Sequence, residues 1–263
     1  MSRLLLVGCG NMGGALLRGW IDRGIPVADI VVIEPAAAGL PAGVARVPAE
    51  TQVPATFRPD VVVLAVKPQI LDAVLPPLAR FAGATFLSIA AGKPLAALAA
   101  GLGADAALVR AMPNTPAAVG RGVTVAVANA RVDDDARRRC SRLLEAVGEV
   151  AWIEDESLMD AVTAVSGSGP AYVFMLAETL AAAGVAAGLP ADLSERLARA
   201  TVAGAGEMLH TSPLPAERLR RNVTSPNGTT AAALEILMAG DGMAQLLERA
   251  VAAATRRSRE LAG

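Results

Sequence analysis

Near its start the chain reads Arg3-Leu4-Leu5-Leu6-Val7-Gly8-Cys9-Gly10-Asn11-Met12-Gly13, and this stretch decides the fold. The apolar run from Arg3 to Val7 is typical of a short buried strand. Residues 14–23 then place apolar side chains at helical spacing, and Gly24 follows where a helix commonly ends in glycine. The glycines therefore connect a predicted strand to a predicted helix.

The glycines follow the pattern G-x-G-x-x-G, formed by Gly8, Cys9, Gly10, Asn11, Met12 and Gly13. In nucleotide-binding folds the first glycine permits a tight turn and the second lets the backbone approach a pyrophosphate. The third lets the helix pack on the strand. A plain glycine turn is the alternative, but the strand before the motif, the helix after it and an acid further on favour a dinucleotide site.

The acid is Glu34, which follows the next predicted strand, Ile30 to Ile33. An acid at this position accepts a hydrogen bond from the ribose 2′-hydroxyl of NADH and repels the 2′-phosphate of NADPH. No arginine lies between Pro35 and Ala45 to receive that phosphate. Charge therefore favours NADH over NADPH, and a contact from a residue further along the chain is the open alternative.

Apolar runs typical of strands recur through the first half and alternate with helical segments. They lie at Gly43 to Val47, Asp60 to Ala65, Thr85 to Ile89, Ala107 to Ala111, Val123 to Ala128 and Glu149 to Ile153. Glycine, proline and small residues follow several of them, and open α/β sheets bind ligands at the carboxyl ends of their strands. Lys67 stands at such an end. It is interpreted as a cofactor or loop-ordering contact, with a solvated lysine before a helix as the alternative.

The pattern changes at about Glu154, and no strand pattern appears after about Ile153. The fold class is therefore an α/β Rossmann-like N-terminal domain, residues 1–153, followed by an all-α C-terminal dimerisation domain, residues 154–263. Helices are predicted over 171–188, 193–209, 215–222, 230–238 and 243–261, with an interruption at 166–170. The apolar faces of these helices would bury more surface if two subunits shared them, so we expect an intertwined dimer at least.

One polar stretch interrupts the apolar helices: Asn222-Val223-Thr224-Ser225-Pro226-Asn227-Gly228-Thr229-Thr230. Thr224 and Ser225 are interpreted as helix-cap residues, and Pro226 as part of the first turn of an alanine-rich helix. Such a helix start binds anions, carboxylates included. The alternative is an ordinary cap between two packed helices.

Composition and charge argue against several classes of function. The 263 residues carry a net charge of −1 and a pI near 5.9, without a basic stripe for nucleic acid or a membrane surface. The N-terminal apolar run is too short for a signal peptide, and the most apolar window, Tyr172 to Gly188, contains Glu178. Cys9 and Cys140 are too few for a disulfide framework. We expect a soluble cytoplasmic protein with reduced thiols and without a metal.

Few side chains are available for acid–base catalysis. The only histidine, His210, falls in a predicted turn over 210–214, and the only lysines are Lys67 and Lys93. Hydride transfer to a carbonyl needs an acid for the oxyanion, commonly His or Lys. Transfer to a protonated imine needs none, because the cation accepts the hydride directly and becomes an amine. A helical half without lysine suits the second reaction.

Six motifs together resemble the motif series of pyrroline-5-carboxylate reductase and cover essentially the whole chain. They are residues 8–13, Ala65-Val66-Lys67-Pro68-Gln69, Ser88-Ile89-Ala90-Ala91-Gly92, Arg110-Ala111-Met112-Pro113-Asn114-Thr115-Pro116, Ser166-Gly167-Ser168-Gly169-Pro170-Ala171-Tyr172 and Val223 to Thr230. The last two are specific, whereas the first is shared by all Rossmann proteins. Asn227 stands where many members carry glycine, and asparagine tolerates a left-handed backbone. Glu34-Pro35 also departs from members that place a polar residue and arginine there for NADPH.

The resemblance implies reduction of the C=N bond of 1-pyrroline-5-carboxylate to L-proline with NADH or NADPH, the last step of proline synthesis. It also implies a decamer built of dimers, with each active site lined by helices of two subunits. Besides Gly13 and Glu34 of the motif argument, it places cofactor contacts at Gly8 to Met12, Ala65, Val66, Lys67, Pro68, Ala90, Ala91 and Asn222. It places substrate contacts at Glu156, Ser225, Gly228, Thr229 and Thr230.

Thr230 is the expected catalytic residue, because its hydroxyl can hydrogen-bond near the ring nitrogen and orient the imine. The alternative is a hydroxyl that bonds back to its own helix. Two other functions fit parts of the sequence. A β-hydroxyacid dehydrogenase shares the layout, but it relies on a lysine in the helical domain that this chain lacks. A non-catalytic NAD(P)-sensing protein would explain the glycine motif and the dimer, but not an anion-ready loop in the helical half.

Overall fold

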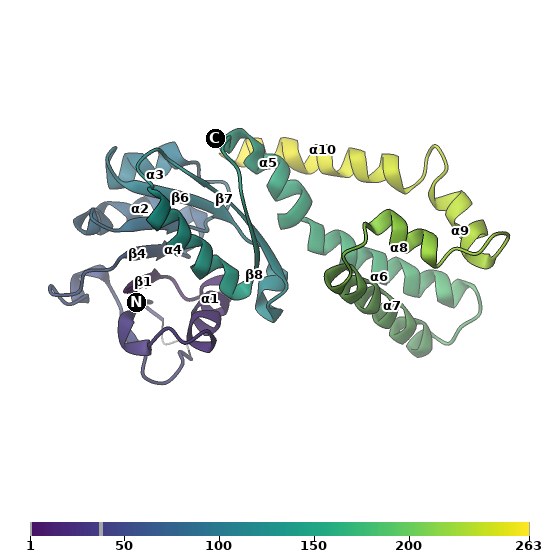
Figure 1. Cartoon of the computed structure of the whole chain (residues 1–263), viewed down its shortest axis with the longest axis horizontal. Coiled ribbons are helices and arrows are strands. Elements are labelled where there is room, and N and C mark those ends of the chain that lie inside the picture. The colour runs from purple at the N-terminus through teal and green to yellow at the C-terminus, as the bar shows by residue number, and fades with distance from the viewer. Residues whose placement is uncertain (1, 37–38, 263) are drawn as a thin grey trace. The chain divides into compact units, whose positions relative to one another are not determined.

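The computed structural model describes residues 2–36 and 39–262 (Figure 1). It divides into two compact units. The sheet unit comprises the described residues up to Gly167 together with those from Thr255 onward, and the helical unit comprises Ser168–Ala254. The sequence-predicted boundary at 153/154 follows the last strand, whereas the compact units divide after Gly167 and return the end of the chain to the sheet unit.

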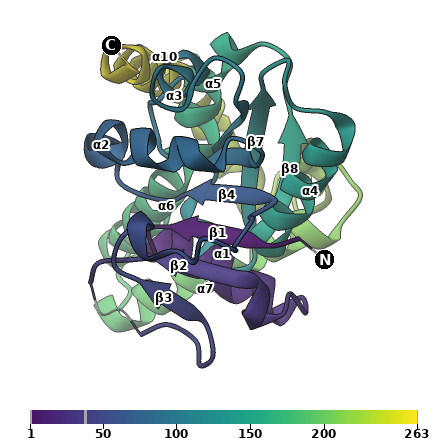
Figure 2. The same ribbon diagram turned by 90° about the vertical axis from the view of Figure 1, so that its left-hand side faces the viewer.

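The sheet unit contains one sheet in the order β3-β2-β1-β4-β5-β6-β7-β8. Figure 2 shows β3, β2, β1 and β4 side by side in this order. The strands are β1 Leu4–Val7, β2 Ile30–Ile33, β3 Ala45–Val47, β4 Val61–Leu64, β5 Thr85–Ser88, β6 Ala107–Met112, β7 Gly122–Ala128 and β8 Gly148–Trp152. Strands β1 to β6 run parallel, and β7 turns antiparallel to β6 while pairing in parallel with β8. Every strand expected from the sequence is therefore present, and the α/β fold class is confirmed.

The central strands are buried on both faces, which explains their unbroken apolar runs. In β1, Leu4 and Leu6 belong to one apolar cluster, and Leu5 and Val7 belong to the other. The first cluster is completed by α1 (Asn11–Asp22) and α4 (Asp134–Leu144), and the second by α2 (Pro68–Leu78) and α3 (Leu95–Leu102). The sheet unit thus has a core of its own on each face of the sheet.

The chain leaves the sheet through an irregular helical passage. A 3₁₀ turn, Glu156–Leu158, is followed by α5 (Met159–Val162) and a π-helical turn, Thr163–Gly167. The expected interruption at 166–170 therefore takes the form of a widened helical turn, after which α6 begins at Gly169. The end of the chain returns to this passage, because the Ser258 hydroxyl donates to Asp160 Oδ1 at 2.7 Å.

The helical unit consists of α6 (Gly169–Ala186), α7 (Ala191–Thr211), α8 (Ala216–Asn222), α9 (Thr229–Leu237) and the first part of α10 (Met243–Ala262). No strand occurs after Trp152 within the part of the chain that the structure describes. The turn predicted at 210–214 is wrong at its start: α7 continues to Thr211, so His210 lies in its last turn. Helices α6 and α7 pack closely, since a Cβ on Gly184 would lie 2.1 Å from Ser194 Oγ.

The helical unit has almost no core within one chain. Only Ser194 and Ala198 are buried between residues 168 and 254, whereas Phe174 is 67% exposed and Ile236 is 75% exposed. Residues 156–186 are also long and apolar enough to cross a membrane, by length and composition alone, with none of that window buried. Apolar helices without a core need a covering surface, which is consistent with the dimer expected from the sequence.

Candidate functional site

The glycine motif directly follows β1 and includes the first turn of α1. Helix α1 begins at Asn11 rather than at Gly14, with Gly10 as its N-cap and no side chain accepting from the first N–H groups. Asn11, Met12 and Gly13 therefore present backbone N–H groups without intrahelical partners. This free helix start is a site for a pyrophosphate.

Each of the three glycines of the motif is needed for a different physical reason. Gly8 has φ +89°, and a Cβ there would lie 2.8 Å from the Ala65 carbonyl oxygen. A Cβ on Gly13 would lie 2.5 Å from the Gly8 carbonyl oxygen, so this glycine permits the helix to cross the strand. A Cβ on Gly10 would meet nothing within 4 Å. Gly10 therefore leaves open the space into which a pyrophosphate can approach the backbone.

Glu34 lies against the glycine motif. Its Oε2 accepts a hydrogen bond from the Cys9 N–H at 2.8 Å, and its Oε1 accepts one from the Ala36 N–H at 3.1 Å. Burial, followed by the Glu34 charge, raises the pKa of the Cys9 thiol. Cys9 is therefore held as a neutral thiol beside a carboxylate.

Arg46 corresponds to the open alternative of a contact from further along the chain. Its Nη1 donates to the Ala36 carbonyl oxygen at 2.7 Å, from a strand that pairs Val32 with Arg46. Arg46 is the first arginine after residues 35–45, of which Ala37 and Ala38 lie outside the described residues. The pairing of β2 with β3 brings it to this edge of the sheet.

A pocket of about 450 Å³ opens at the carboxyl ends of β1, β2 and β4. Five of the predicted cofactor residues line it: Gly8, Glu34, Ala65, Val66 and Lys67. Pro48, Ala49 and Glu50 also line it and were not predicted. A larger pocket of about 610 Å³ lies beside Arg3 and Asp60, where strands begin rather than end, so it is not the candidate cofactor site.

The remaining predicted residues of the sheet unit lie on two loops. Lys67 is the exposed N-cap of α2, and Pro68 is its first residue. Ala90 is buried after β5 and its N–H donates to Ser88 Oγ at 3.3 Å, whereas Ala91 is exposed. Both loops follow the carboxyl ends of neighbouring strands, β4 and β5.

In the helical unit, the polar stretch leaves the start of α9 uncapped. The N-cap is Gly228, with no side-chain cap, and α9 begins at Thr229. The expected caps are wrong, because the Thr224 hydroxyl donates back to the Arg220 carbonyl oxygen at 2.7 Å and closes α8 instead. Ser225 and Pro226 lie in the loop before the helix. The first N–H groups of α9 are consequently available to an anion.

The loop before α9 has a defined shape. The Gly228 N–H donates to the Ser225 carbonyl oxygen at 3.1 Å, which closes a tight turn. Asn227 has φ 57°, the left-handed conformation expected for it, and it is alone among the described non-glycine residues in having a positive φ. A Cβ on Gly228 would lie 2.4 Å from Ser225 Oγ. Ser225, Gly228, Thr229 and Thr230 are therefore held together around one helix start, and Asn222 ends the preceding helix.

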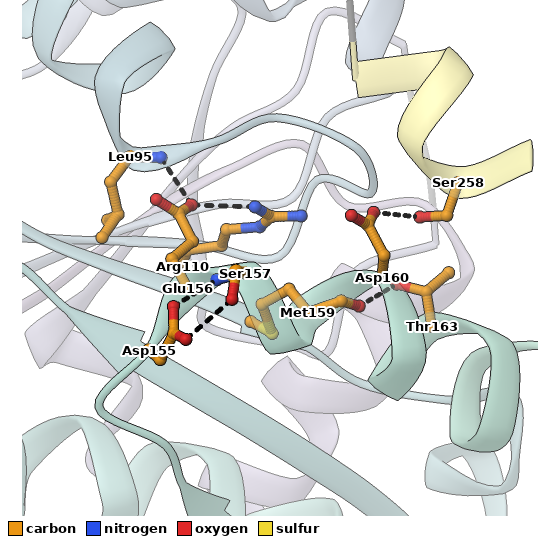
Figure 3. A network of polar contacts seen from close by, with 9 residues as sticks. All are labelled: Leu95, Arg110, Asp155, Glu156, Ser157, Met159, Asp160, Thr163 and Ser258. Atoms are coloured by element: carbon orange, nitrogen blue, oxygen red, sulfur yellow. Dashed lines mark hydrogen bonds and ion pairs between the residues drawn. The ribbon is translucent and has the colours of Figure 1, made fainter. Parts of the chain in front are cut away.

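Glu156 is engaged elsewhere. Its Oε1 accepts from Arg110 Nη1 and from the Leu95 N–H, both at 2.8 Å (Figure 3). The predicted residues thus fall into two groups. The sheet unit contains Glu156 and every predicted cofactor residue except Asn222. The helical unit contains Asn222 and the remaining predicted substrate residues. Within the described ranges, 2–36 and 39–262, no cluster of His, Cys, Asp and Glu side chains suits a metal ion.

Comparison with known proteins adds relatives that match along the whole chain. Two family models match, pyrroline-5-carboxylate reductase dimerisation at residues 156–261 and NADP oxidoreductase coenzyme F420-dependent at residues 3–92. The pyrroline-5-carboxylate reductase of Pseudomonas aeruginosa is 43% identical, over 99% of this chain and 97% of the relative. That of Mycobacterium tuberculosis is 39% identical, over 99% and 97%.

Solved structures agree with these relatives. A pyrroline-5-carboxylate reductase from Coxiella burnetii superposes with a TM-score of 0.90 at 33% identity, covering 99% of this chain and 98% of that one. The Plasmodium falciparum enzyme, solved with NADP bound, superposes with a TM-score of 0.83 at 30% identity, covering 100% and 98%.

Proposed function

Because the chain belongs to the pyrroline-5-carboxylate reductase family, we propose that it reduces 1-pyrroline-5-carboxylate to L-proline with NAD(P)H, the final step of proline biosynthesis. One observation carries the proposal on the structural side. The helical unit presents an uncapped helix start at Gly228 to Thr230, and the chain has no lysine after position 93. This combination suits a protonated imine that carries a carboxylate better than a carbonyl substrate.

In this proposal the cofactor is held by residues of the sheet unit, with Asn222 as the one proposed contact from the helical unit. The free start of α1 and the open space over Gly10 fit a pyrophosphate. The pocket lined by Glu34, Ala65, Val66 and Lys67 fits the ribose end of a dinucleotide. The same role extends to Gly8 through Gly13, Pro68, Ala90, Ala91 and Asn222.

NADH is the better partner for the charge of this pocket. Both Glu34 and Glu50 line it, and a carboxylate repels a 2′-phosphate while it accepts a hydrogen bond from a 2′-hydroxyl. Lys67 is the opposing charge that lines the pocket, whereas Arg46 is not a lining residue and its Nη1 donates to the Ala36 carbonyl oxygen. We therefore assign the discrimination between the two cofactors to Glu34.

The substrate is held by the helical unit in this proposal. Its carboxylate accepts from the free N–H groups at the start of α9, with Ser225, Gly228 and Thr229 shaping the loop. The chemistry that NAD(P)H supplies when bound is a hydride, which the carbon of the protonated imine accepts while the C=N π pair moves to nitrogen and leaves a neutral amine. The half-buried Thr230 orients the ring nitrogen by a hydrogen bond, and no protein acid has to deliver a proton to an oxyanion.

Self-association follows from the dimerisation domain and from the missing core of the helical unit. We further propose that the dimers assemble into a decamer, that residues 1–153 act as the cofactor domain, and that residues 154–263 act as the substrate and dimerisation domain. The protein works in the cytoplasm without a nucleic-acid or membrane partner. The net charge of −1 supports this, because it offers neither partner an attractive surface. The molar mass measured by light scattering during size-exclusion chromatography tests whether the protein forms a decamer.

A steady-state assay tests the function. The purified protein is mixed with 1-pyrroline-5-carboxylate and either NADH or NADPH, and the loss of nicotinamide absorbance is followed. We expect oxidation that depends on the imine and a higher kcat/KM with NADH. Parallel runs with β-hydroxyacids and NAD⁺ test the dehydrogenase alternative. If neither cofactor is oxidised in the presence of the imine, the proposed reaction is wrong.

A further inference from the structure

Arg110 is a buried charge in the middle of the sheet unit. It lies on β6, between β5 and β7, and it is only 7% exposed. A guanidinium cannot lose its charge in a protein, so at this depth it requires a partner. Its Nη1 lies 2.8 Å from Glu156 Oε1, which belongs to the passage that leaves the sheet (Figure 3).

Glu156 makes a second contact with the same oxygen atom. Its Oε1 accepts from the Leu95 N–H at 2.8 Å, and Leu95 is the first residue of α3. The N-cap of α3 is Pro94, which offers no side-chain cap. Glu156 therefore caps α3 from a distant part of the chain, and its negative charge complements the positive end of the helix dipole.

The loop before α3 connects these contacts to the cofactor site. It runs from Ile89 to Pro94 and carries Ala90 and Ala91, which are two of the proposed cofactor contacts. One end is attached to the sheet, where the Ile89 N–H donates to the Leu64 carbonyl oxygen at 3.0 Å. The Glu156 contact with Leu95 immobilises the other end. In between, Lys93 forms only a partly exposed ion pair with Asp72, which contributes little.

We propose that Arg110 and Glu156 are positioning residues for the cofactor: Arg110 orients the Glu156 carboxylate, and that carboxylate fixes the loop from Ile89 to Pro94. The inference rests on the proposed cofactor site and deepens it. It also moves Glu156 from the substrate contacts, where the resemblance placed it, to the cofactor loop. The sequence contains no local sign of this role, because the partners lie far apart along the chain.

The test measures cofactor binding and substrate use separately. NADH binding is titrated without substrate, and the KM for 1-pyrroline-5-carboxylate is measured at saturating NADH. Glu156→Ala should weaken NADH binding at least tenfold while the KM for the imine stays within twofold. Glu156→Gln retains an acceptor oxygen for the Leu95 N–H, so its NADH affinity should lie between those of Glu156→Ala and the native protein.

A matched control lies four positions along the same passage. Asp160 accepts from the Ser258 hydroxyl and pairs with Arg259, both on α10, so Asp160→Asn should leave NADH affinity within twofold. The double variant Arg110→Met with Glu156→Leu separates positioning from stability. Because this double variant leaves no buried charge unpaired, its Tm should lie close to that of the native protein. Its NADH affinity should nevertheless stay as low as that of Glu156→Ala.

Three outcomes would overturn the inference. In the first, Glu156→Ala raises the KM for the imine and leaves NADH affinity unchanged, which assigns Glu156 to the substrate. In the second, the double variant regains native NADH affinity, so that the pair only stabilises the fold. In the third, Asp160→Asn weakens NADH binding as much as Glu156→Ala. NADH binding is measured without substrate, so its result does not depend on the proposed reaction. If the proposed reaction is wrong, the native protein will fail to oxidise NADH in the presence of 1-pyrroline-5-carboxylate.

Discussion

The second and third glycines of the motif should respond in opposite ways to the same added methyl group. Gly10 has φ −70° and ψ −160°, which alanine adopts freely, and a Cβ there meets nothing within 4 Å. A Cβ on Gly13 would lie 2.5 Å from the Gly8 carbonyl oxygen and 3.1 Å from Ala65 Cβ. Gly10→Ala therefore perturbs only the space kept for the cofactor, whereas Gly13→Ala perturbs the packing of α1 on the sheet.

The expected magnitudes follow from these environments. Overpacking a tight site costs about 1–3 kcal/mol. For a chain of this size 1 kcal/mol corresponds to about 2–4 °C in Tm, so Gly13→Ala should lower Tm by about 2–12 °C. A compatible Gly→Ala change instead stabilises by about 0.4–1 kcal/mol through the unfolded chain, so Gly10→Ala should keep or slightly raise Tm. Loss of one hydrogen bond to a charged phosphate costs about 1.5–3 kcal/mol, which weakens cofactor binding by roughly 10- to 150-fold.

Two measurements on the same samples check this pair. Thermal unfolding without cofactor gives the stability of each variant, and NADH titration at a temperature where both are folded gives Kd. We expect Gly10→Ala to be stable and weak in binding, and Gly13→Ala to be both unstable and weak. Native NADH affinity in Gly10→Ala, or an equal loss of Tm in the two variants, would refute the division of roles between the glycines.

Four further predictions concern single side chains. Glu34→Gln should raise the ratio of kcat/KM for NADPH to that for NADH about 5- to 150-fold, since removing a carboxylate near a phosphate is worth about 1–3 kcal/mol; an unchanged ratio contradicts the charge argument. Thr230→Ala should lower kcat with imine binding partly kept, while Thr230→Ser, which retains the hydroxyl, should lower it less. Unchanged turnover in Thr230→Ala would assign Thr230 a structural role in α9 only. Burial raises the pKa of the Cys140 thiol to about 12, so below that pH it stays protonated; a thiol reagent at pH 8 should modify only Cys9 until the protein is unfolded. Phe174→Glu should weaken self-association in light scattering while NADH binding persists; a native oligomer would remove Phe174 from the subunit interface.

The strands were predictable because parallel strands buried on both faces leave a signal in consecutive residues. Ile30 to Ile33 was predicted with the bounds that the structure shows, and the run predicted at 60–65 became Val61–Leu64. The start of α1 was predicted at Gly14 and lies at Asn11 instead. The glycine motif was interpreted as a loop up to its last glycine, although half of it forms the first helical turn.

The contacts that shape the candidate sites were less predictable, because they depend on partners distant in sequence. Thr224 has the residue type of an N-cap, yet its hydroxyl bonds back to the helix before it. Glu156 has the charge of a substrate ligand or a solvated acid, and only the fold brings Arg110 and Leu95 to it. Arg46 lies on a short, exposed strand, and its pairing with β2 places it beside Ala36. Local sequence propensity does not indicate which partner each of these side chains takes, because the partner is determined by tertiary packing.

The candidate cofactor site and the candidate substrate site differ in how far they depend on the association of subunits. The sheet unit has two apolar clusters of its own, so the glycine motif and its pocket can keep their shape in a single chain. The helical unit buries only Ser194 and Ala198 within one chain, so the start of α9 has no rigid support until the apolar helices are covered. Loss of the subunit interface should therefore abolish turnover before it abolishes cofactor binding, because only the substrate site depends on a core that two subunits share.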